Sequence, residues 1–390
     1  MSRGAVAARY HTEIVQSRWI QQLNLFNFRN YDTLQLNLEK SSAVLIGPNG
    51  AGKTNILEAL SFLSSGKGFR KAKLGALTNL AFPEREWSVG VVLGLDQGDS
   101  IHIGTGLRAD KEEEQRAIKI NQTFQPQSSL AEWVTVLWQI PQMDFLFSES
   151  LSKRRRFFDK LVAAFVPEYT QHLYRYDHAL RERSRLLRER MSDPQWLKIL
   201  EQTISQEAMA VVSLRQSYLE NLSPFCSEHF SLFPRVLVSL AGELEQWSET
   251  MPSLEVEERF QEYLKNNRAQ DAITGGSSMG VHHTYVRMHH VDQNKPIEIC
   301  STGEQKALIL SLVLANCRLQ TNLCMRTPLL LLDEIVSHLD EKRRLSLFEE
   351  IQSLGVQAWL TGTDGDVFEP FKKHAQFFEV SDGNVLPKDV

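Results

Sequence analysis

The chain has few cysteines, and none of them has the spacing that cysteine chemistry requires. Four cysteines (Cys226, Cys300, Cys317 and Cys324) occur among 390 residues, with no C-x-x-C pair and no nearby histidine pattern. Zinc fingers and disulfide-stapled secreted scaffolds are therefore excluded. We expect reduced, mostly buried thiols in a cytosolic protein.

Long hydrophobic runs are also missing. No apolar stretch approaches the roughly 20 residues that a helix needs to cross a bilayer. The N-terminus has no apolar segment typical of a secretory signal. We therefore expect no association with membranes. Hydrophobic residues still make up 42% of the chain and charged residues 23%, as in globular proteins, and the length allows two or three domains.

No strong excess of one charge is present overall, since the net charge is −5, but the charge is unevenly distributed. Between residues 153 and 190, eleven Lys/Arg accompany five Asp/Glu, a local balance of +6. Such asymmetry favours a surface for a polyanion such as DNA. Helical spacing places three arginines on one face: Arg181, Arg185 and Arg188. The consecutive Arg154, Arg155 and Arg156 cannot share a face, so at least one of them is expected to be structural and to pair with an acid such as Asp159. A solvated helix face with i,i+4 ion pairs remains the alternative.

What the sequence does contain is a complete phosphate-binding loop of the form G-x-x-x-x-G-K-T. An apolar run at residues 43–46 precedes it as a buried strand, and a helical segment at residues 55–60 follows. Glycines let backbone N–H groups approach a phosphate, and the helix N-terminus favours the anion. We expect Lys53 to reach the β- and γ-phosphates of ATP and the Thr54 hydroxyl to bind Mg²⁺. The nucleotide-binding residues of the loop are Gly47, Pro48, Asn49, Gly50, Ala51, Gly52, Lys53 and Thr54.

A second motif consists of four leucines, residues 329–332, followed by Asp333 and Glu334. On a buried parallel strand these acids lie at the carboxyl edge of the sheet, where ligands bind. We expect Asp333 to hold Mg²⁺ and Glu334 to act as the general base, with Lys53 as the third catalytic residue.

A third motif, Ser301-Thr302-Gly303-Glu304-Gln305-Lys306, opens a long helix. Ser301 and Glu304 form a capping box, so a purely structural role is possible. The functional interpretation is the S-x-G-x-Q signature of ABC ATPases, in which Ser301, Gly303 and Gln305 meet the ATP of a second subunit. Downstream, residues 337–340 match the D-loop of such enzymes and end in Asp340.

The order of these motifs predicts an α/β fold with an ABC-type ATPase head and an inserted arm. Short strands up to residue 140 form a mixed sheet and an antiparallel β lobe, with residues 111–114 as a loop. Two long helices near residues 168–190 and 196–222 form a helical hairpin. A less regular stretch then reaches residue 267, and residues 297–300 form a short strand. The predicted domains are 1–148 (first half of the head), 149–274 (helical arm) and 275–390 (second half of the head).

The chain resembles the RecF family of bacterial recombination-repair proteins. Lys53 and Ser301 are 248 residues apart, too far for a transporter ATPase and too close for an SMC protein with its long coiled coil. The matching segments are Leu25-Phe26-Asn27-Phe28-Arg29-Asn30-Tyr31, the phosphate loop with residues 55–59, Gly68-Phe69-Arg70, residues 154–159, the signature and the Asp333-to-Asp340 block.

The resemblance implies a slow DNA-dependent ATPase that acts as a conformational switch. ATP would join two copies into a homodimer that binds gapped or junction DNA and aids RecA loading, with RecR and RecO as partners. The resemblance also adds Arg29 and Asp340 to the expected nucleotide-binding residues. It adds Gln142 to the expected metal site, with Gln139 as the alternative.

Two segments depart from the family pattern. Residues 280–284 read Gly-Val-His-His-Thr instead of a Gly-Pro-His-Arg-Asp-like stretch, and no switch histidine follows residues 359–362, where Thr363 is the candidate γ-phosphate contact. Two other functions remain as alternatives, an ABC ATPase subunit of a membrane complex and one of a nuclease complex.

Overall fold

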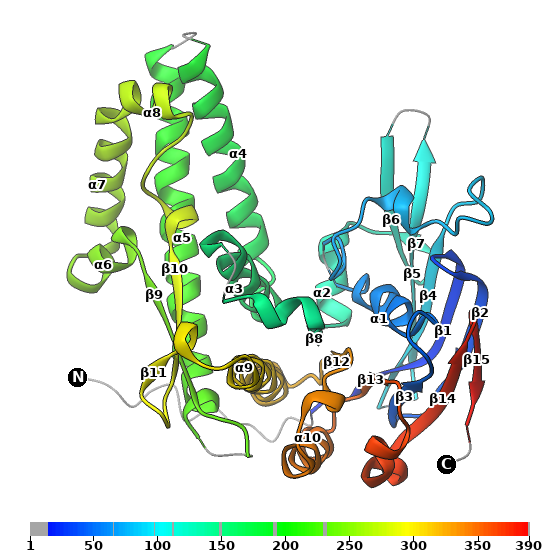
Figure 1. Ribbon diagram of the computed structural model, residues 1–390. Coiled ribbons are helices and arrows are strands. Elements are labelled where there is room, and N and C mark those ends of the chain that lie inside the picture. Colours follow the sequence, from blue (N-terminus) through cyan, green and yellow to red (C-terminus); the bar gives the residue numbers. More distant parts are fainter. Residues whose placement is uncertain are drawn as a thin grey trace. The chain divides into compact units, whose positions relative to one another are not determined.

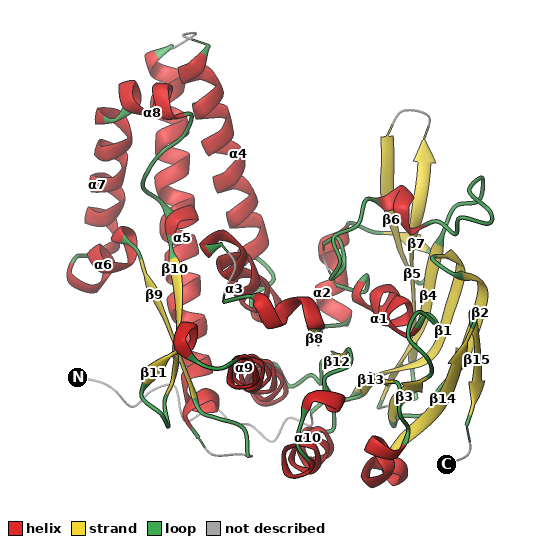
Figure 2. Cartoon of the chain, in the orientation of Figure 1, coloured by secondary structure: helices red, strands yellow, loops and turns green. Residues whose placement is uncertain are grey.

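The computed structural model describes residues 15–64, 66–96, 98–110, 113–147, 150–189, 193–228 and 232–388. Two compact units emerge from the contacts between residues. Unit 1 comprises residues 1–143, 229–233 and 313–390, and unit 2 comprises residues 144–228 and 234–312. Strands dominate the first unit and helices the second (Figure 2).

Unit 1 contains a six-stranded antiparallel sheet in the order β2-β1-β4-β5-β6-β7. Strands β1, β2 and β4 mostly alternate between buried and more exposed side chains, as expected for a sheet with one covered face. Glu113 and Glu114 belong to β6, so the predicted acidic loop is wrong at these two residues, while Lys111 and Glu112 lie outside the described residues. The strands are β1 (Arg18–Phe28), β2 (Tyr31–Asn37), β4 (Ser88–Leu95), β5 (Ser100–Asp110), β6 (Glu113–Ile120) and β7 (Thr123–Phe124).

The second sheet of unit 1 has the order β15-β14-β3-β13-β12-β8 and is parallel except for β15 (Figure 1). Its central strands are buried along their whole length, which is why they read as continuous apolar runs. Helix α1 (Lys53–Ser61) packs against β13 and β8. The strands are β3 (Ser42–Ile46), β8 (Val136–Gln139), β12 (Leu329–Leu332), β13 (Ala358–Gly362), β14 (Ala375–Ser381) and β15 (Asn384–Pro387). The remaining α-helices are α2 (Leu130–Trp133) and α10 (Glu341–Leu354).

Unit 2 is built around the predicted helical hairpin, in which α4 (Tyr169–Arg188) and α5 (Pro194–Ser227) pack side by side (Figure 1). Asp193 caps α5 by accepting the Gln195 N–H at 2.8 Å, and Pro194 occupies the first turn, where its missing N–H costs nothing. The other elements are α3 (Leu151–Phe165), β9 (Val236–Ala241), α6 (Glu243–Thr250), α7 (Ser253–Asn266), α8 (Arg268–Thr274), β10 (Tyr285–His290) and β11 (Lys295–Pro296). Helix α9 (Thr302–Leu323) contains the division between the units.

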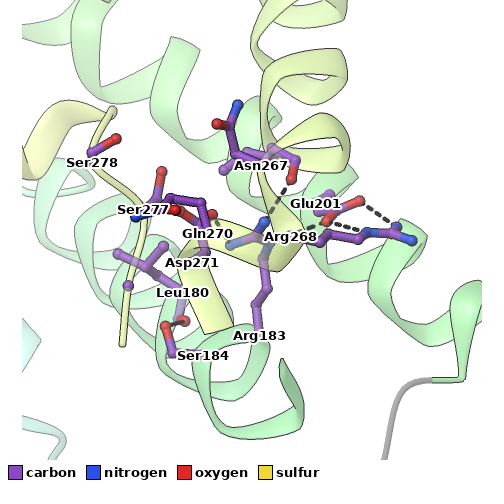
Figure 3. Close-up of polar contacts among 12 residues, drawn as sticks. Leu180, Arg183, Ser184, Glu201, Asn267, Arg268, Gln270, Asp271, Ser277 and Ser278 are labelled. Atoms are coloured by element: carbon purple, nitrogen blue, oxygen red, sulfur yellow. Dashed lines mark hydrogen bonds and ion pairs between the residues drawn. The ribbon is translucent and has the colours of Figure 1, made fainter. Parts of the chain in front are cut away.

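A buried ion network joins α4, α5 and α8 within unit 2 (Figure 3). The Arg183 side chain is fully buried; it donates to Glu201 at 3.0 Å, to Asp271 at 2.7 Å and to the Leu264 carbonyl at 2.6 Å. Arg268 forms a second, bidentate pair with Glu201 at 2.8 and 2.6 Å. Buried charges are tolerated only when paired and hydrogen-bonded in this way.

The predicted fold class is confirmed, but two more local predictions are wrong. Residues 223–267, expected to be less regular, contain the end of α5 with β9, α6 and α7. Residues 297–299 form a 3₁₀ turn and not a strand. The prediction that at least one of Arg154, Arg155 and Arg156 is structural and pairs with an acid is confirmed for Arg154, although its partner is Glu298, since Asp159 pairs with Arg215.

The structure groups residues 275–312 with unit 2, and the predicted boundary at 148/149 lies outside the described residues. The domain limits from the sequence therefore stay a prediction. The four cysteines are free thiols, three of them buried. Among the described residues, no helix combines the length and the apolar character needed to span a membrane.

Candidate nucleotide-binding site

The phosphate loop connects β3 to α1 and depends on its glycines. Gly50 and Gly52 adopt φ angles of 82° and 116°, a region that side chains disfavour. A Cβ at Gly52 would lie 2.5 Å from both Asn30 Nδ2 and Tyr31 Oη, and one at Gly47 would lie 2.0 Å from the Val380 carbonyl oxygen. The loop therefore closes tightly against β14, β2 and the turn before β2, and a residue with a side chain could not replace either glycine.

Backbone N–H groups of the loop form a potential anion site. Within the described part of the chain, the N–H groups of Gly50, Gly52, Lys53 and Thr54 donate to no protein acceptor. Ala51, by contrast, donates to the Pro48 carbonyl at 3.3 Å. Unpaired donors at a helix N-terminus bind anions well, because they add to the positive end of the helix dipole.

Lys53 is buried and its ammonium group folds back onto the loop. Its Nζ donates to the carbonyls of Gly47 at 2.6 Å and Pro48 at 2.9 Å. Burial lowers the pKa of Lys53, and the nearby Glu334 and Asp333 carboxylates partly oppose that shift. The cation is therefore held at the loop by carbonyl dipoles, in the position expected of a phosphate ligand.

The second acidic motif meets the loop at the carboxyl edge of the parallel sheet. Asp333 follows β12, and its Oδ1 accepts the Thr54 hydroxyl at 3.0 Å across 279 residues of sequence. The Asp333 N–H donates to the Gln139 carbonyl at 3.0 Å, which fixes the carboxylate next to β8. Burial raises the pKa of Asp333, while hydrogen bonds from Thr361 and Thr54 favour its charged form.

Glu334 has an unusual backbone. Its φ of 57° lies in the left-handed region, which is uncommon for a residue with a Cβ. The Glu334 N–H donates to the Thr361 hydroxyl oxygen at 2.9 Å, and the same hydroxyl donates to Asp333 Oδ1 at 2.8 Å. Thr361 thus bridges both acids, although the sequence analysis did not single it out.

Arg29 lies beside the loop helix but binds a carboxylate. Its guanidinium donates to both oxygens of Glu58 at 2.9 and 2.8 Å, and Glu58 is almost fully buried on α1. Arg70 shares Glu58 at 2.9 Å and also donates to Asn55 at 2.7 Å. The assignment of Arg29 to the nucleotide stays a prediction.

Sequence reasoning missed an amide chain beneath the loop. Asn30 Nδ2 donates to the Ala51 carbonyl at 3.2 Å, and Asn55 Nδ2 donates to Asn30 Oδ1 at 2.7 Å. Both asparagines stand next to motif residues in the sequence. Adjacency to a motif was the one available signal, and it does not reveal which neighbours touch.

Three of the remaining predicted residues of unit 1, Gln139, Gln142 and Thr363, lie at or just after the ends of β8 and β13. Gln139 is buried at the end of β8, whereas Gln142 is exposed in the 3₁₀ turn that follows. Asp340 caps α10 by accepting the Arg343 N–H at 2.9 Å, and Thr363 is exposed just after β13. These positions leave the choice between Gln139 and Gln142 open.

The signature motif lies in unit 2, at the start of α9. The predicted capping box is confirmed: Glu304 accepts the Ser301 N–H at 2.7 Å, and the Glu304 N–H donates to the Ser301 hydroxyl at 3.4 Å. The Ser301 hydroxyl also donates to the Glu304 carboxylate at 2.9 Å, and the bonds from the Ser301 N–H, the Ser301 hydroxyl and Lys295 (3.1 Å) lower the pKa of Glu304 to about 2. Gln305 donates to the Ile297 and Cys300 carbonyls, both at 3.1 Å, and so anchors the preceding turn. Ser301 and Gly303 are exposed.

The basic segment of unit 2 divides into surface and interior residues. Arg181, Arg185 and Arg188 are exposed on α4, whereas Arg183 is buried in the ion network. Arg185 pairs with Glu182 at 2.9 Å and Glu189 at 3.2 Å. Arg190, also in this segment, lies outside the described residues.

The donor groups of unit 1 fit a magnesium nucleotide. The loop offers backbone N–H donors and a buried cation for phosphate oxygens, as charge-assisted hydrogen bonding requires. Thr54 and Asp333 offer adjacent hydroxyl and carboxylate oxygens, the ligand type that Mg²⁺ prefers. Magnesium bound by Thr54 and Asp333 would neutralise phosphate charge. The half-buried Glu334 directly follows Asp333 in the chain.

Comparison with known proteins gives one consistent result. The family model described as "RecF/RecN/SMC N terminal domain" matches residues 19–385. The chain is 39% identical over 370 residues to the "DNA replication and repair protein RecF" of Rhizobium meliloti, covering 94% of this chain and 98% of the relative. A relative of the same name from Rhizobium etli is 40% identical over 371 residues, with the same coverage.

Solved structures show the same fold. A structure described as the recombination mediator protein RecF with ATP in the RecFOR pathway matches with a TM-score of 0.82 and 22% identity, covering 96% of this chain and 100% of that chain. An SMC head bound to the C-terminal winged-helix domain of ScpA matches with a TM-score of 0.55 and 17% identity, covering 95% of this chain and 98% of that chain.

Proposed function

The chain belongs to the RecF family of DNA replication and repair proteins, and on that premise we propose that it is an ATP-dependent DNA-binding protein of recombinational repair. The observation that carries the proposal is the Thr54–Asp333 hydrogen bond of 3.0 Å. It joins the phosphate loop to the acidic motif, and a shared metal-nucleotide site explains why two segments so distant in sequence meet there.

ATP binding and hydrolysis follow from the roles of four side chains. Lys53 and Thr54 would hold the phosphates and Mg²⁺, Asp333 would complete the metal site, and Glu334 would act as general base toward the attacking water. A solved structure described as RecF with ATP shares the fold of this chain, which supports the proposal that this chain binds the nucleotide.

Dimerisation would supply the rest of the site. Ser301 and Gly303 are exposed at the start of α9, where a helix N-terminus can meet the phosphate of a nucleotide held by a second copy. ATP would then act as the bridge between two copies, and its hydrolysis would release them. The partners of this state would be gapped or junction DNA and the mediators RecR and RecO, with RecA loading as the outcome.

The test is ATP-driven dimerisation, measured by light scattering coupled to size-exclusion chromatography. The wild type is expected to be monomeric without nucleotide and dimeric with ATP and Mg²⁺, because a ligand that binds only the dimer shifts the equilibrium by mass action. Lys53→Ala should weaken ATP binding about 10- to 100-fold, since it removes charge-assisted contacts. Glu334→Gln should bind ATP and keep the dimer, because the base that ends the cycle is lost.

Ser301→Arg separates the two interpretations of the signature. This variant should bind ATP without dimerising, because the larger charged side chain fills the space that the partner's phosphate needs. Glu304→Ala is the matched control, since it breaks the capping box while leaving Ser301 in place. Equal dimerisation of both variants and the wild type would reduce Ser301 to a helix cap.

A further inference from the structure

A single buried hydroxyl connects the two acids of the candidate hydrolytic centre. Thr361 is fully buried near the end of β13, the strand next to β12 in the parallel sheet. Its Oγ1 donates to Asp333 Oδ1 at 2.8 Å and accepts the N–H of Glu334 at 2.9 Å. A hydroxyl has one proton to donate and lone pairs to accept with, so both bonds form at once.

The bond to Glu334 holds a strained backbone. A non-glycine residue in the left-handed region costs about 1–2 kcal/mol and persists only where its surroundings fix it. The Glu334 φ of 57° is such a case, and its N–H is held by the Thr361 hydroxyl. Since the Glu334 side chain leaves the backbone at this point, its direction depends on that peptide.

The bond from Thr361 leaves the two carboxylate oxygens of Asp333 with different roles. Oδ1 accepts both hydroxyls, from Thr361 at 2.8 Å and from Thr54 at 3.0 Å. No donor among the described residues binds Oδ2. The carboxylate is therefore fixed in rotation by two bonds on one side, while its other oxygen stays available for the hydration shell of a cation.

We propose that Thr361 is a positioning residue of the hydrolytic centre, whose hydroxyl holds the metal-binding carboxylate of Asp333 and the backbone of the general base Glu334 in one arrangement. This inference rests on the proposed function. Thr361 touches neither the phosphates nor the water in this role; it acts through the two acids. Hydrolysis is expected to depend on it more than nucleotide binding does.

The main test is Thr361→Val, which replaces the hydroxyl by a methyl group of similar size. We expect kcat for ATP to fall about 10- to 100-fold, because small misplacements of catalytic groups cost about that much. The dissociation constant for ATP should stay within about threefold, since the loop is untouched. The Mg²⁺ concentration for half-maximal turnover should rise, and the ATP-bound dimer should live longer, as with Glu334→Gln.

Rescue and a matched control separate positioning from general stability. Thr361→Ser keeps the hydroxyl and should retain most of the wild-type kcat, whereas Thr361→Ala loses the same packing and the hydroxyl. Thr327→Val is the control: Thr327 is also buried in unit 1 and accepts the Arg18 N–H at 2.9 Å, but it precedes β12, at its amino end. Thr327→Val should lower thermal stability without changing kcat or the Mg²⁺ requirement.

The outcomes distinguish this inference from the proposed function. If the wild type neither binds nor hydrolyses ATP, the proposed function fails and Thr361 loses its role with it. If the wild type hydrolyses ATP but Thr361→Val keeps its kcat and Mg²⁺ requirement, the positioning role alone is overturned. If Thr361→Val does not fold, equal kcat of the Ser and Ala variants overturns it, and a higher kcat of Ser supports it.

Discussion

His282 is a neutral histidine fixed by its two ring nitrogens. Its Nε2 lies 3.0 Å from the Ser277 carbonyl, which can only accept, so this nitrogen carries the proton. Its Nδ1 then accepts the Tyr176 hydroxyl at 2.6 Å. Burial, with His283 close by, lowers the pKa of His282 from 6.5 to about 4. The loop at residues 280–284 is thus built around an uncharged imidazole.

The first prediction is a pH-dependent loss of stability caused by His282. The unfolded state binds a proton near pH 6.5 and the folded state only near pH 4. Because the pKa of His282 is lower in the folded state, neutral His282 contributes to the free energy of unfolding. This contribution is complete above pH 6.5 and is lost as the pH falls toward 4. That loss amounts to about 3 kcal/mol at most. Urea midpoints between pH 4 and 7.5 should fall less steeply in His282→Gln than in the wild type.

The control for this prediction is His178→Gln, since His178 is exposed on α4 and, among the residues that the structure describes, makes only a ring contact with Tyr174. Its pH profile should follow the wild type. A wild-type slope in His282→Gln would mean that another group causes the acid sensitivity of unit 2.

Single residues also show where sequence reasoning succeeds and where it stops. Lys53, Thr54 and Asp333 were predicted together because short motifs fix their roles, and Thr54 and Asp333 do meet. Thr361 was missed because its role arises from a hydrogen bond to a strand neighbour 28 residues away. A threonine in an apolar strand is ordinary in sequence, and nothing local marks it as a bridge between two acids.

At the level of helices, the sequence likewise does not show which charged residues are buried. The basic segment was counted as a surface, yet Arg183 is buried because Glu201 and Asp271 approach from α5 and α8. Helical spacing placed Arg181, Arg185 and Arg188 on one face, and all three are exposed, but no spacing rule identifies the partners of Arg183, which are 18 and 88 residues away. The long hairpin itself was predictable, because its apolar period and the Asp193-Pro194 start are local signals.

The second prediction concerns how Arg183 holds these helices. Arg183→Leu should lower the free energy of unfolding of unit 2 by about 3–5 kcal/mol, because it leaves Asp271 buried without its cation. Adding Asp271→Leu should restore part of the loss, since the double variant has no orphaned charge. Urea unfolding followed by circular dichroism measures both.

Arg185→Leu is the matched control for Arg183→Leu. Arg185 lies two residues further along α4 and also pairs with two acids, but it is exposed. Its loss should leave the midpoint unchanged, because surface ion pairs contribute little. If both variants unfold at the same urea concentration, the buried network does not stabilise the arm.

At the scale of the whole molecule, the proposed DNA-binding surface is the stripe of arginines on α4. Arg181, Arg185 and Arg188 are exposed on one helix, but their charge is partly shared within it. Arg181 and Arg188 donate to the carbonyls of Asp177 and Ser184, and Arg185 is held by two glutamates. DNA phosphates would have to compete with those glutamates, so we expect the stripe to supply fewer contacts than its three charges suggest.

The third prediction is therefore a moderate change in salt dependence. Replacing Arg181, Arg185 and Arg188 with Ala should reduce the slope of log K against log salt by about two, since each phosphate contact contributes about one. ATP-driven dimerisation should be unaffected. The double variant Arg259→Ala, Lys265→Ala removes two exposed positive charges from α7 and tests whether charge lost elsewhere in unit 2 has a similar effect. An unchanged slope in the triple variant would exclude the arm and direct the search to unit 1. There Lys67, Arg70, Lys71 and Lys73 lie close in sequence, and Arg70 connects through Asn55 and Asn30 to the phosphate loop.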